Sequence, residues 1–220
     1  MKGSWKFDDV IANSFDGIAR SHIPDYERVI ARSVEIASAA FPAREAKILD
    51  VGSATGYTLE RLRAAGFAHV YGVDSSEAML RKSRVREGLI SAQTFPAAEA
   101  PFDTVLANWT LHFVPKEQRR IYFSDIYAGL CNGGILIVSD KMTSDQFVHD
   151  RYHDFKRSHG VTERAIREKE AAVAGVLMTL PLAWYLDTLA AVGFENIDVI
   201  DASWCFKTIL CRKFKEKPAT

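Results

Sequence analysis

The chain has 220 residues, of which 48% are hydrophobic and 25% are charged, and 28 basic residues balance 28 acidic residues to a formal net charge of +0. This size and composition predict a single domain over residues 1–220 with a sizeable core, and the charge balance argues against a protein that binds nucleic acid directly. No apolar run is long enough to span a membrane and the first residues lack the apolar stretch of a secretory signal, so a cytoplasmic protein is expected.

The cysteines support the same compartment. Cys131, Cys205 and Cys211 form no C-x-x-C pair, and an odd number of cysteines fits reduced thiols better than a disulfide framework. We therefore expect three core thiols.

Residues 4–40 are expected to form a helical cap ahead of the core. Val10, Ile11, Phe15 and Ile18 recur at helical spacing, Pro24 interrupts the pattern, and residues 26–40 are helical again. Such a cap can cover the mouth of a cofactor site and keep water out, or it can simply cover one face of a sheet. The pattern allows both interpretations.

Residues 47–74 read as strand, tight turn, helix, strand and acid. The apolar run 47–51 leads into the small-residue turn 52–56, residues 57–65 have helical spacing, and the apolar run 70–73 ends at Asp74. Small residues let the backbone approach a ligand, and the turn opens a helix N-terminus that favours anionic groups. An acid about 20 residues after the turn can accept both hydroxyls of a ribose, so this stretch predicts a nucleotide-type site.

Two cofactor classes use this arrangement. A dinucleotide site requires G-x-G-x-x-G, which is broken here by Ala54 and Thr55. The spacing Asp50-x-Gly52-x-x-x-Gly56 instead resembles the first motif of class I S-adenosylmethionine (SAM) methyltransferases. A βαβ unit without a ligand is the third possibility.

The middle of the chain continues the alternation of strands and helices. We expect a helix over 75–86, a strand over 89–93, a strand over 102–108, a helix over 118–130 and a buried strand over 135–138. Gln93 and Thr94 fall where such enzymes contact the adenine amino group. Asn108 ends a strand at the edge where ligands bind in open α/β sheets, and His112 is as readily a rim residue as a base.

The last part departs from this alternation. Residues 143–180 are polar, expected to be helical, and too long for a simple crossover, so they predict a lid or a dimer arm. A helix over 182–192 and a strand pair over 197–200 and 206–211 close the chain. Because a terminal hairpin is typical of class I methyltransferases and not of dehydrogenases, it favours SAM over a dinucleotide. The predicted fold is a Rossmann-like class I SAM methyltransferase, with a seven-stranded, mostly parallel sheet, a terminal antiparallel strand and a core over 44–142 and 181–213.

Several blocks carry a closer resemblance. They are Trp5-Lys6-Phe7-Asp8, the stretch 20–26 (RSHIPDY), the stretch 108–113 (NWTLHF), Ser139-Asp140-Lys141, and above all His153-Asp154-Phe155-Lys156-Arg157 followed by Gly160. With them, nearly the whole chain resembles the carboxy-S-adenosylmethionine synthases, which serve modification of the wobble uridine of tRNA. The resemblance implies a homodimer, and a reaction in which a SAM ylide captures carbon dioxide from prephenate.

The resemblance also implies cofactor contacts. They fall at Tyr26, Gly52, Ser53, Ala54, Asp74, Ser75, Gln93, Thr94 and Asn108, to which the glycine-turn motif adds Asp50 and Gly56. Two positions depart from the family. Gln93 replaces an acid but still offers a carbonyl oxygen to an adenine amino group. Glu170 replaces the arginine that holds the added carboxylate, and its like charge opposes that product unless Lys169 or Arg167 substitutes.

Three functions follow. The preferred one is a methyltransferase that converts SAM to S-adenosylhomocysteine (SAH) with a small-molecule acceptor, and His153, with Tyr152 beside it, is the best candidate base. His153 also suits helix packing or a dimer contact. The alternatives are carboxy-SAM synthesis and SAM binding without catalysis. No metal ligand is expected at the site.

Overall fold

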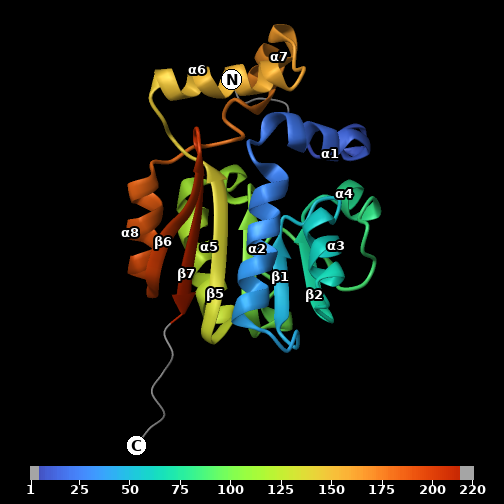
Figure 1. Ribbon diagram of the computed structural model, residues 1–220, viewed down its shortest axis with the longest axis vertical. Coiled ribbons are helices and arrows are strands. Elements are labelled where there is room, and N and C mark those ends of the chain that lie inside the picture. Colours follow the sequence, from blue (N-terminus) through green and yellow to red (C-terminus); the bar gives the residue numbers. More distant parts are fainter. Residues whose placement is uncertain (1–4, 214–220) are drawn as a thin grey trace, which may run out of the picture.

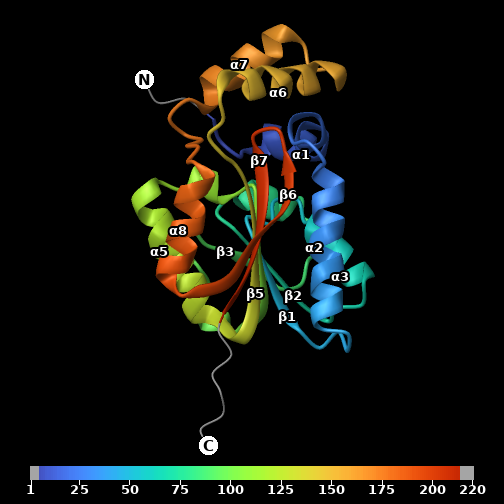
Figure 2. The same cartoon turned by 60° about the vertical axis from the view of Figure 1, so that its left-hand side comes forward.

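The computed structural model describes residues 5–213. Its centre is a seven-stranded sheet in the order β3-β2-β1-β4-β5-β7-β6 (Figures 1 and 2). The strands are β1 (Lys47–Val51), β2 (His69–Asp74), β3 (Leu89–Ser91), β4 (Phe102–Asn108), β5 (Leu130–Lys141), β6 (Phe194–Ser203) and β7 (Phe206–Lys213). β7 is antiparallel to both of its neighbours, and the other paired strands are parallel. The predicted fold class is confirmed, including its terminal antiparallel strand.

Helices surround this sheet, and some of them cover its two faces. They are α1 (Asp9–His22), α2 (Tyr26–Ala40), α3 (Tyr57–Ala64), α4 (Glu77–Arg81), α5 (Lys116–Gly129), α6 (Gln146–Ser158), α7 (Glu163–Val173) and α8 (Leu182–Val192). On one face, Ala37 of α2 and Leu59 of α3 pack on Ile48. On the other, Phe123 of α5 and Leu189 of α8 pack in the larger core cluster. These fully buried contacts hold the strand ends in fixed positions.

The remaining helices lie beyond the carboxyl ends of the parallel strands. Figures 1 and 2 show α1, α6 and α7 above the end of the sheet from which β5 leads into α6. The segment between β5 and α8 is helical as predicted, in two helices joined through Gly160. The cap and the α6–α7 segment therefore enclose the edge where open α/β sheets bind ligands.

One helix is shorter than the sequence predicts. Ser76 caps α4, its Oγ accepting from the Met79 N–H, but the helix ends at Arg81 instead of residue 86. Beyond it, the Arg84 N–H donates to the Thr55 carbonyl at 3.0 Å, and the Ser83 hydroxyl donates to the Val85 carbonyl. The Arg84 N–H is therefore bound to the glycine turn and is not available to continue the helix.

Candidate active site

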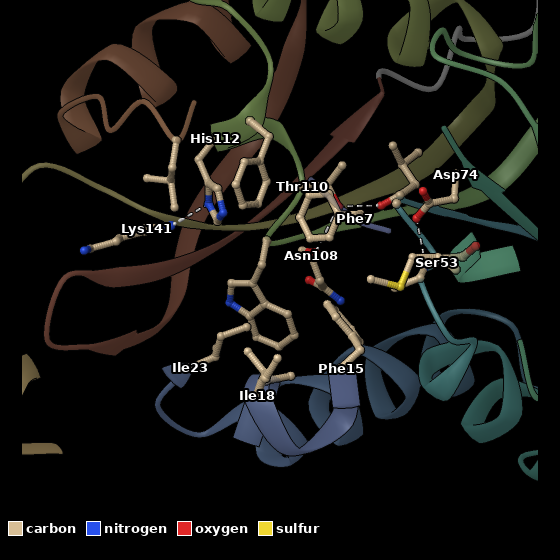
Figure 3. A pocket seen from close by; sticks show the side chains of 18 of the residues that line it. Phe7, Phe15, Ile18, Ile23, Ser53, Asp74, Asn108, Thr110, His112 and Lys141 are labelled. Carbon is tan, nitrogen blue, oxygen red and sulfur yellow. Dashed lines mark hydrogen bonds between the residues drawn. The ribbon is translucent and has the colours of Figure 1, made fainter. Parts of the chain in front are cut away.

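A cavity of about 310 Å³ lies at the carboxyl ends of β1, β2 and β4. Its walls come from the first residues of the described chain, from α1 and α2, from the glycine turn, and from α6 and α7. Figure 3 shows part of this lining, including Phe7, Ser53 and Lys141. This is the region that the sequence predicts for a nucleotide-type cofactor. All the predicted cofactor residues line the cavity except Gly56 and Thr94.

The turn after β1 requires its glycines. Gly52 has φ +71°, and a Cβ there would lie 2.0 Å from Oγ1 of Thr110, which itself donates to the Val51 carbonyl at 3.0 Å. Gly56 has φ +77°, and a Cβ there would lie 2.3 Å from the Ser83 hydroxyl. Both positions combine a backbone conformation that favours glycine with an approach that a side chain prevents. Gly56 thus shapes the turn without facing the cavity.

Two carboxyl groups lie at this end of the cavity. Asp74 accepts hydrogen bonds from the Ala54 N–H at 2.9 Å and from the Ser76 N–H at 2.8 Å, so it ties the turn to β2. Burial raises the pKa of Asp74, and burial together with the Asp74 charge raises the pKa of Asp50 to about 8. Such a pair favours hydrogen-bond donors or a positive group in the adjacent space.

The cavity wall contains buried polar atoms without partners. Among residues 5–213, neither the carbonyl oxygen nor the amide nitrogen of the Asn108 side chain has a hydrogen-bond partner, and the Ser53 hydroxyl also lacks one. Both residues line the cavity (Figure 3). Buried polar groups are rarely left unpaired, because each costs about 1–3 kcal/mol. These atoms therefore fit a bound molecule that carries both donors and acceptors, as a nucleoside does.

Aromatic rings form the wall next to the turn. Tyr26 stacks on Tyr57 with ring centroids 5.9 Å apart and contacts Trp109 at 4.9 Å. Tyr26 is buried and lines the cavity, as the resemblance implies. Ser75 and Gln93 line it from the β2 and β3 side.

The other end of the cavity is positively charged. Lys141, Lys156 and Lys169 all line it, and the ammonium groups of Lys141 and Lys156 lie 4.6 and 4.5 Å from the centre of the Tyr152 ring. Burial, followed by repulsion from the other two lysines, lowers the pKa of Lys169 to about 8, and burial lowers the pKa of Lys156 to about 8 as well. Sequence reasoning missed Lys141 and Lys156, because nothing in their spacing indicates that they converge.

Glu170 lies among these positive groups. Its carboxylate is 2.5 Å from His153 Nε2, 3.7 Å from Lys156 Nζ and 3.9 Å from His149 Nε2. Two histidines and a carboxylate could bind a metal ion, but Lys156 occupies the same carboxylate, so we interpret the group as an ion-pair cluster. Arg167 is exposed and pairs with Glu163, so of the two predicted substitutes for the family arginine it is Lys169 that lines the cavity.

The two predicted candidates for the base differ in position. Tyr152 lines the cavity, but its hydroxyl donates to the His22 carbonyl at 2.9 Å, and burial raises its pKa. His153 is outside the cavity lining and is held by Glu170.

His112 lines the cavity between these two ends (Figure 3). Its Nδ1 lies 2.8 Å from Oδ1 of Asp140, which is fully buried at the end of β5. His112 follows β4 and Asp140 lies at the end of β5, and the pairing of these two strands brings the residues together.

Comparison with known proteins agrees with this site. Residues 49–138 match the family model of a methyltransferase domain. A carboxy-S-adenosyl-L-methionine synthase of Helicobacter hepaticus is 33% identical over 95% of each chain, and that of Nautilia profundicola is 26% identical over 91% of each.

Solved structures share the fold. A SAM-dependent methyltransferase of Thermotoga maritima, described as a possible histamine N-methyltransferase, superposes with a TM-score of 0.63 at 18% identity, over 95% of this chain and 99% of that one. Magnesium protoporphyrin IX methyltransferase of Synechocystis, with bound SAH, gives 0.62 at 16% identity, over 94% and 100%. In the described part of the chain, no helix has both the length and the apolar character needed to cross a bilayer. The chain therefore belongs to the carboxy-S-adenosyl-L-methionine synthase family, and it is a SAM-dependent enzyme of the class I methyltransferase fold.

Proposed function

We propose that this protein transfers the methyl group of SAM to a small anionic acceptor. The main support for this proposal is that the two ends of one cavity carry side chains of opposite charge. Asp50 and Asp74 lie at one end, and three lysines lie at the other together with one carboxylate, that of Glu170. This carboxylate contacts His153 and Lys156. A cavity with surplus positive charge at one end favours a substrate with a carboxylate or phosphate group.

The acidic end suits the cofactor. Asp74 would accept the ribose hydroxyls, Asn108 and Ser53 would use their unpaired atoms, and the turn at Gly52 and Ala54 would lie against the amino-acid part. Asp50 supports the same end with a second carboxyl group, and Gly56 shapes the turn. Tyr26, Ser75 and Gln93 complete the proposed cofactor contacts around the nucleoside. Thr94 lies outside the cavity lining and stays a prediction.

Bound SAM supplies an electrophilic methyl group, and the chain's own residues align the acceptor and exclude water. Trp5 and Phe7 close one wall, with the Phe7 ring 5.1 Å from that of Phe113. The lysines would hold the anionic part of the acceptor. His153 and Tyr152 stay predictions as the base, and their contacts support a second role, in which His153 positions Glu170 and Tyr152 supports Lys141 and Lys156.

The test is to incubate the protein with SAM and acidic small-molecule fractions of a cell extract, and to measure SAH by mass spectrometry. We expect SAH with acidic fractions and none with neutral or basic ones. The Lys156→Gln variant should raise KM for the acidic acceptor while the Kd for SAM stays unchanged. SAH formation from neutral or basic fractions alone would contradict the proposal.

Carboxy-SAM synthesis is the second candidate. It is supported by the names of the relatives and by Lys169, which lies in the cavity wall beside Glu170 and could hold a carboxylate where the family has arginine. Incubation with SAM and prephenate, followed by mass spectrometry for a carboxylated sulfonium, separates the two. That product at catalytic turnover would replace methyl transfer as the preferred function.

We further propose that the protein acts in the cytoplasm as a homodimer without binding nucleic acid. The family resemblance supports the dimer, and the three free thiols of Cys131, Cys205 and Cys211 suit a reducing compartment. Size-exclusion chromatography with light scattering measures the oligomeric state, and a monomeric mass would contradict the first part.

A further inference from the structure

We propose that His112 is the general base of the reaction and that Asp140 orients it. The inference rests on the proposed function, because a base is needed only where the acceptor loses a proton as it is methylated. The roles proposed above stay the same: the lysines hold the acceptor, and the cofactor residues hold SAM.

The fold brings the pair together at the centre of the sheet. β4 and β5 are adjacent parallel strands, and β5 ends with Asp140 and Lys141. After β4, the chain turns through the short 3₁₀ helix Leu111–Phe113, which directs His112 toward the end of β5. β4 also supplies Asn108, so the proposed base and the unpaired amide follow the same strand. The base therefore lies between the cofactor end and the lysine end of the cavity (Figure 3).

The partner carboxylate is fixed on every side. Asp140 has no exposed surface, and its Oδ2 accepts a hydrogen bond from the Tyr185 hydroxyl at 2.8 Å. That hydroxyl accepts one from Arg119 Nη1 at 2.7 Å, and Arg119 is itself fully buried. The guanidinium also donates to the carbonyls of Val114 and Met178. These hydrogen bonds hold the Asp140 carboxyl group in one position.

The contacts determine which nitrogen of His112 carries the proton. Nδ1 lies 2.8 Å from Asp140 Oδ1 and 3.1 Å from the Lys141 N–H, and it can donate to the first or accept from the second. A lone pair on Nδ1 would face a carboxylate oxygen at 2.8 Å, which is repulsive, so we assign the proton to Nδ1. Nε2 then carries the lone pair, and it has no hydrogen-bond partner among residues 5–213. This is the arrangement of an imidazole base oriented by a buried carboxylate.

The proposed step combines a proton transfer to His112 with a methyl transfer to the acceptor. The acceptor's X–H bond breaks, His112 Nε2 takes the proton, and the electron pair on X forms the bond to the methyl group, whose former bonding pair stays on sulfur. The imidazolium is stabilised by Asp140 and later releases its proton to water. The other charged groups around it are Arg119 and Tyr185 behind Asp140, and Lys141, Lys156 and Lys169 across the cavity.

The first test reads the tautomer without any acceptor. In the SAH-bound protein with ¹⁵N-labelled histidine, NMR should show the proton of His112 on Nδ1 and a lone pair on Nε2. In Asp140→Asn, the side-chain amide can donate to Nδ1, so the proton should move to Nε2. A wild-type protein with the proton on Nε2, and Nδ1 accepting from the Lys141 N–H, would overturn the proposal.

The second test measures the reaction with the acidic extract fraction that yields SAH. In His112→Asn, kcat should fall by about 10²- to 10⁴-fold, while the Kd for SAH stays within about twofold. Asp140→Asn should lose activity together with the tautomer change. His69→Asn, at the exposed start of β2, is the matched control and should keep full activity.

The outcomes separate the two proposals. A His112→Asn enzyme that retains its kcat within about threefold rejects the base and leaves methyl transfer intact. If no acidic fraction yields SAH, the proposed function fails, and the NMR experiment still decides whether Nε2 has the lone pair that a base requires.

Discussion

Replacing Asn108 with alanine should move the stability of the free protein and its affinity for SAM in opposite directions. Both polar atoms of the Asn108 side chain are buried without a partner, and each such group costs about 1–3 kcal/mol in the free protein. The side chain borders the cavity, so little packing is lost with it. The free energy of unfolding should therefore rise by about 1–2 kcal/mol without cofactor, and SAM should bind about 10- to 100-fold more weakly because its hydrogen bonds to the amide are missing.

Thr104 provides the matched control. Its hydroxyl lies on the same strand and is also buried without a partner among residues 5–213, but Thr104 does not line the cavity. Thr104→Val should raise the free energy of unfolding and leave the affinity for SAM unchanged. Urea denaturation and isothermal titration calorimetry measure the two quantities. If Asn108→Ala destabilised the free protein by more than about 1 kcal/mol, or bound SAM as tightly as the wild type, the reasoning from unpaired atoms would be refuted.

Three further changes test the scaffold. Gly52→Ala places a Cβ 2.0 Å from the Thr110 hydroxyl in a left-handed backbone, so it should lower the free energy of unfolding by about 2–5 kcal/mol. Gly17→Ala is the control and should be neutral or stabilising, because nothing lies within 4 Å of its Cβ. Equal urea midpoints for the two variants would contradict this prediction. Because burial and the Asp74 charge raise the pKa of Asp50 from 3.8 to about 8, the stability it confers is complete below about pH 4 and is lost progressively as the pH rises toward about 8. The cationic cofactor favours the ionised carboxylate of Asp50, so the affinity for SAM should rise over the same pH range. In Asp50→Asn, neither the stability nor the SAM affinity should change with pH in this way. A wild-type protein that shows neither change would exclude the raised pKa of Asp50. Arg119→Met leaves the Tyr185 hydroxyl and the carbonyls of Val114 and Met178 without their buried donor. It should cost about 3–5 kcal/mol by urea denaturation, and a loss below about 1 kcal/mol would count against the network.

The sequence predicts the sheet and the cofactor end of the cavity because their signals are local. The run from Lys47 to Asp74 encodes strand, turn, helix and acid in one continuous stretch, and the structure places Gly52 and Asp74 in the cavity wall. The short α4 could not be predicted from helical spacing. The Arg84 N–H bonds to Thr55, a residue that approaches it only after folding.

The acceptor end could not be predicted for a related reason. Lys141, Lys156 and Lys169 come from β5, α6 and α7, and no periodicity records that these elements converge on one cavity. His112 and Asp140 are 28 positions apart, and their pairing depends on the register of β4 and β5. Electrostatic sites assembled from several elements require the tertiary structure.

The segment 5–7 holds α4 and α7 together across the mouth of the cavity. The Trp5 N–H donates to the Ala172 carbonyl at 3.0 Å, the Lys169 ammonium lies 4.8 Å from the centre of the Trp5 ring, and the Ser76 hydroxyl donates to the Phe7 carbonyl. We expect the nucleoside product to leave past segment 5–7, which requires these contacts to break. We therefore expect product release to limit kcat. Shortening the chain before Asp8 should speed the release of SAH and weaken the binding of both SAM and SAH.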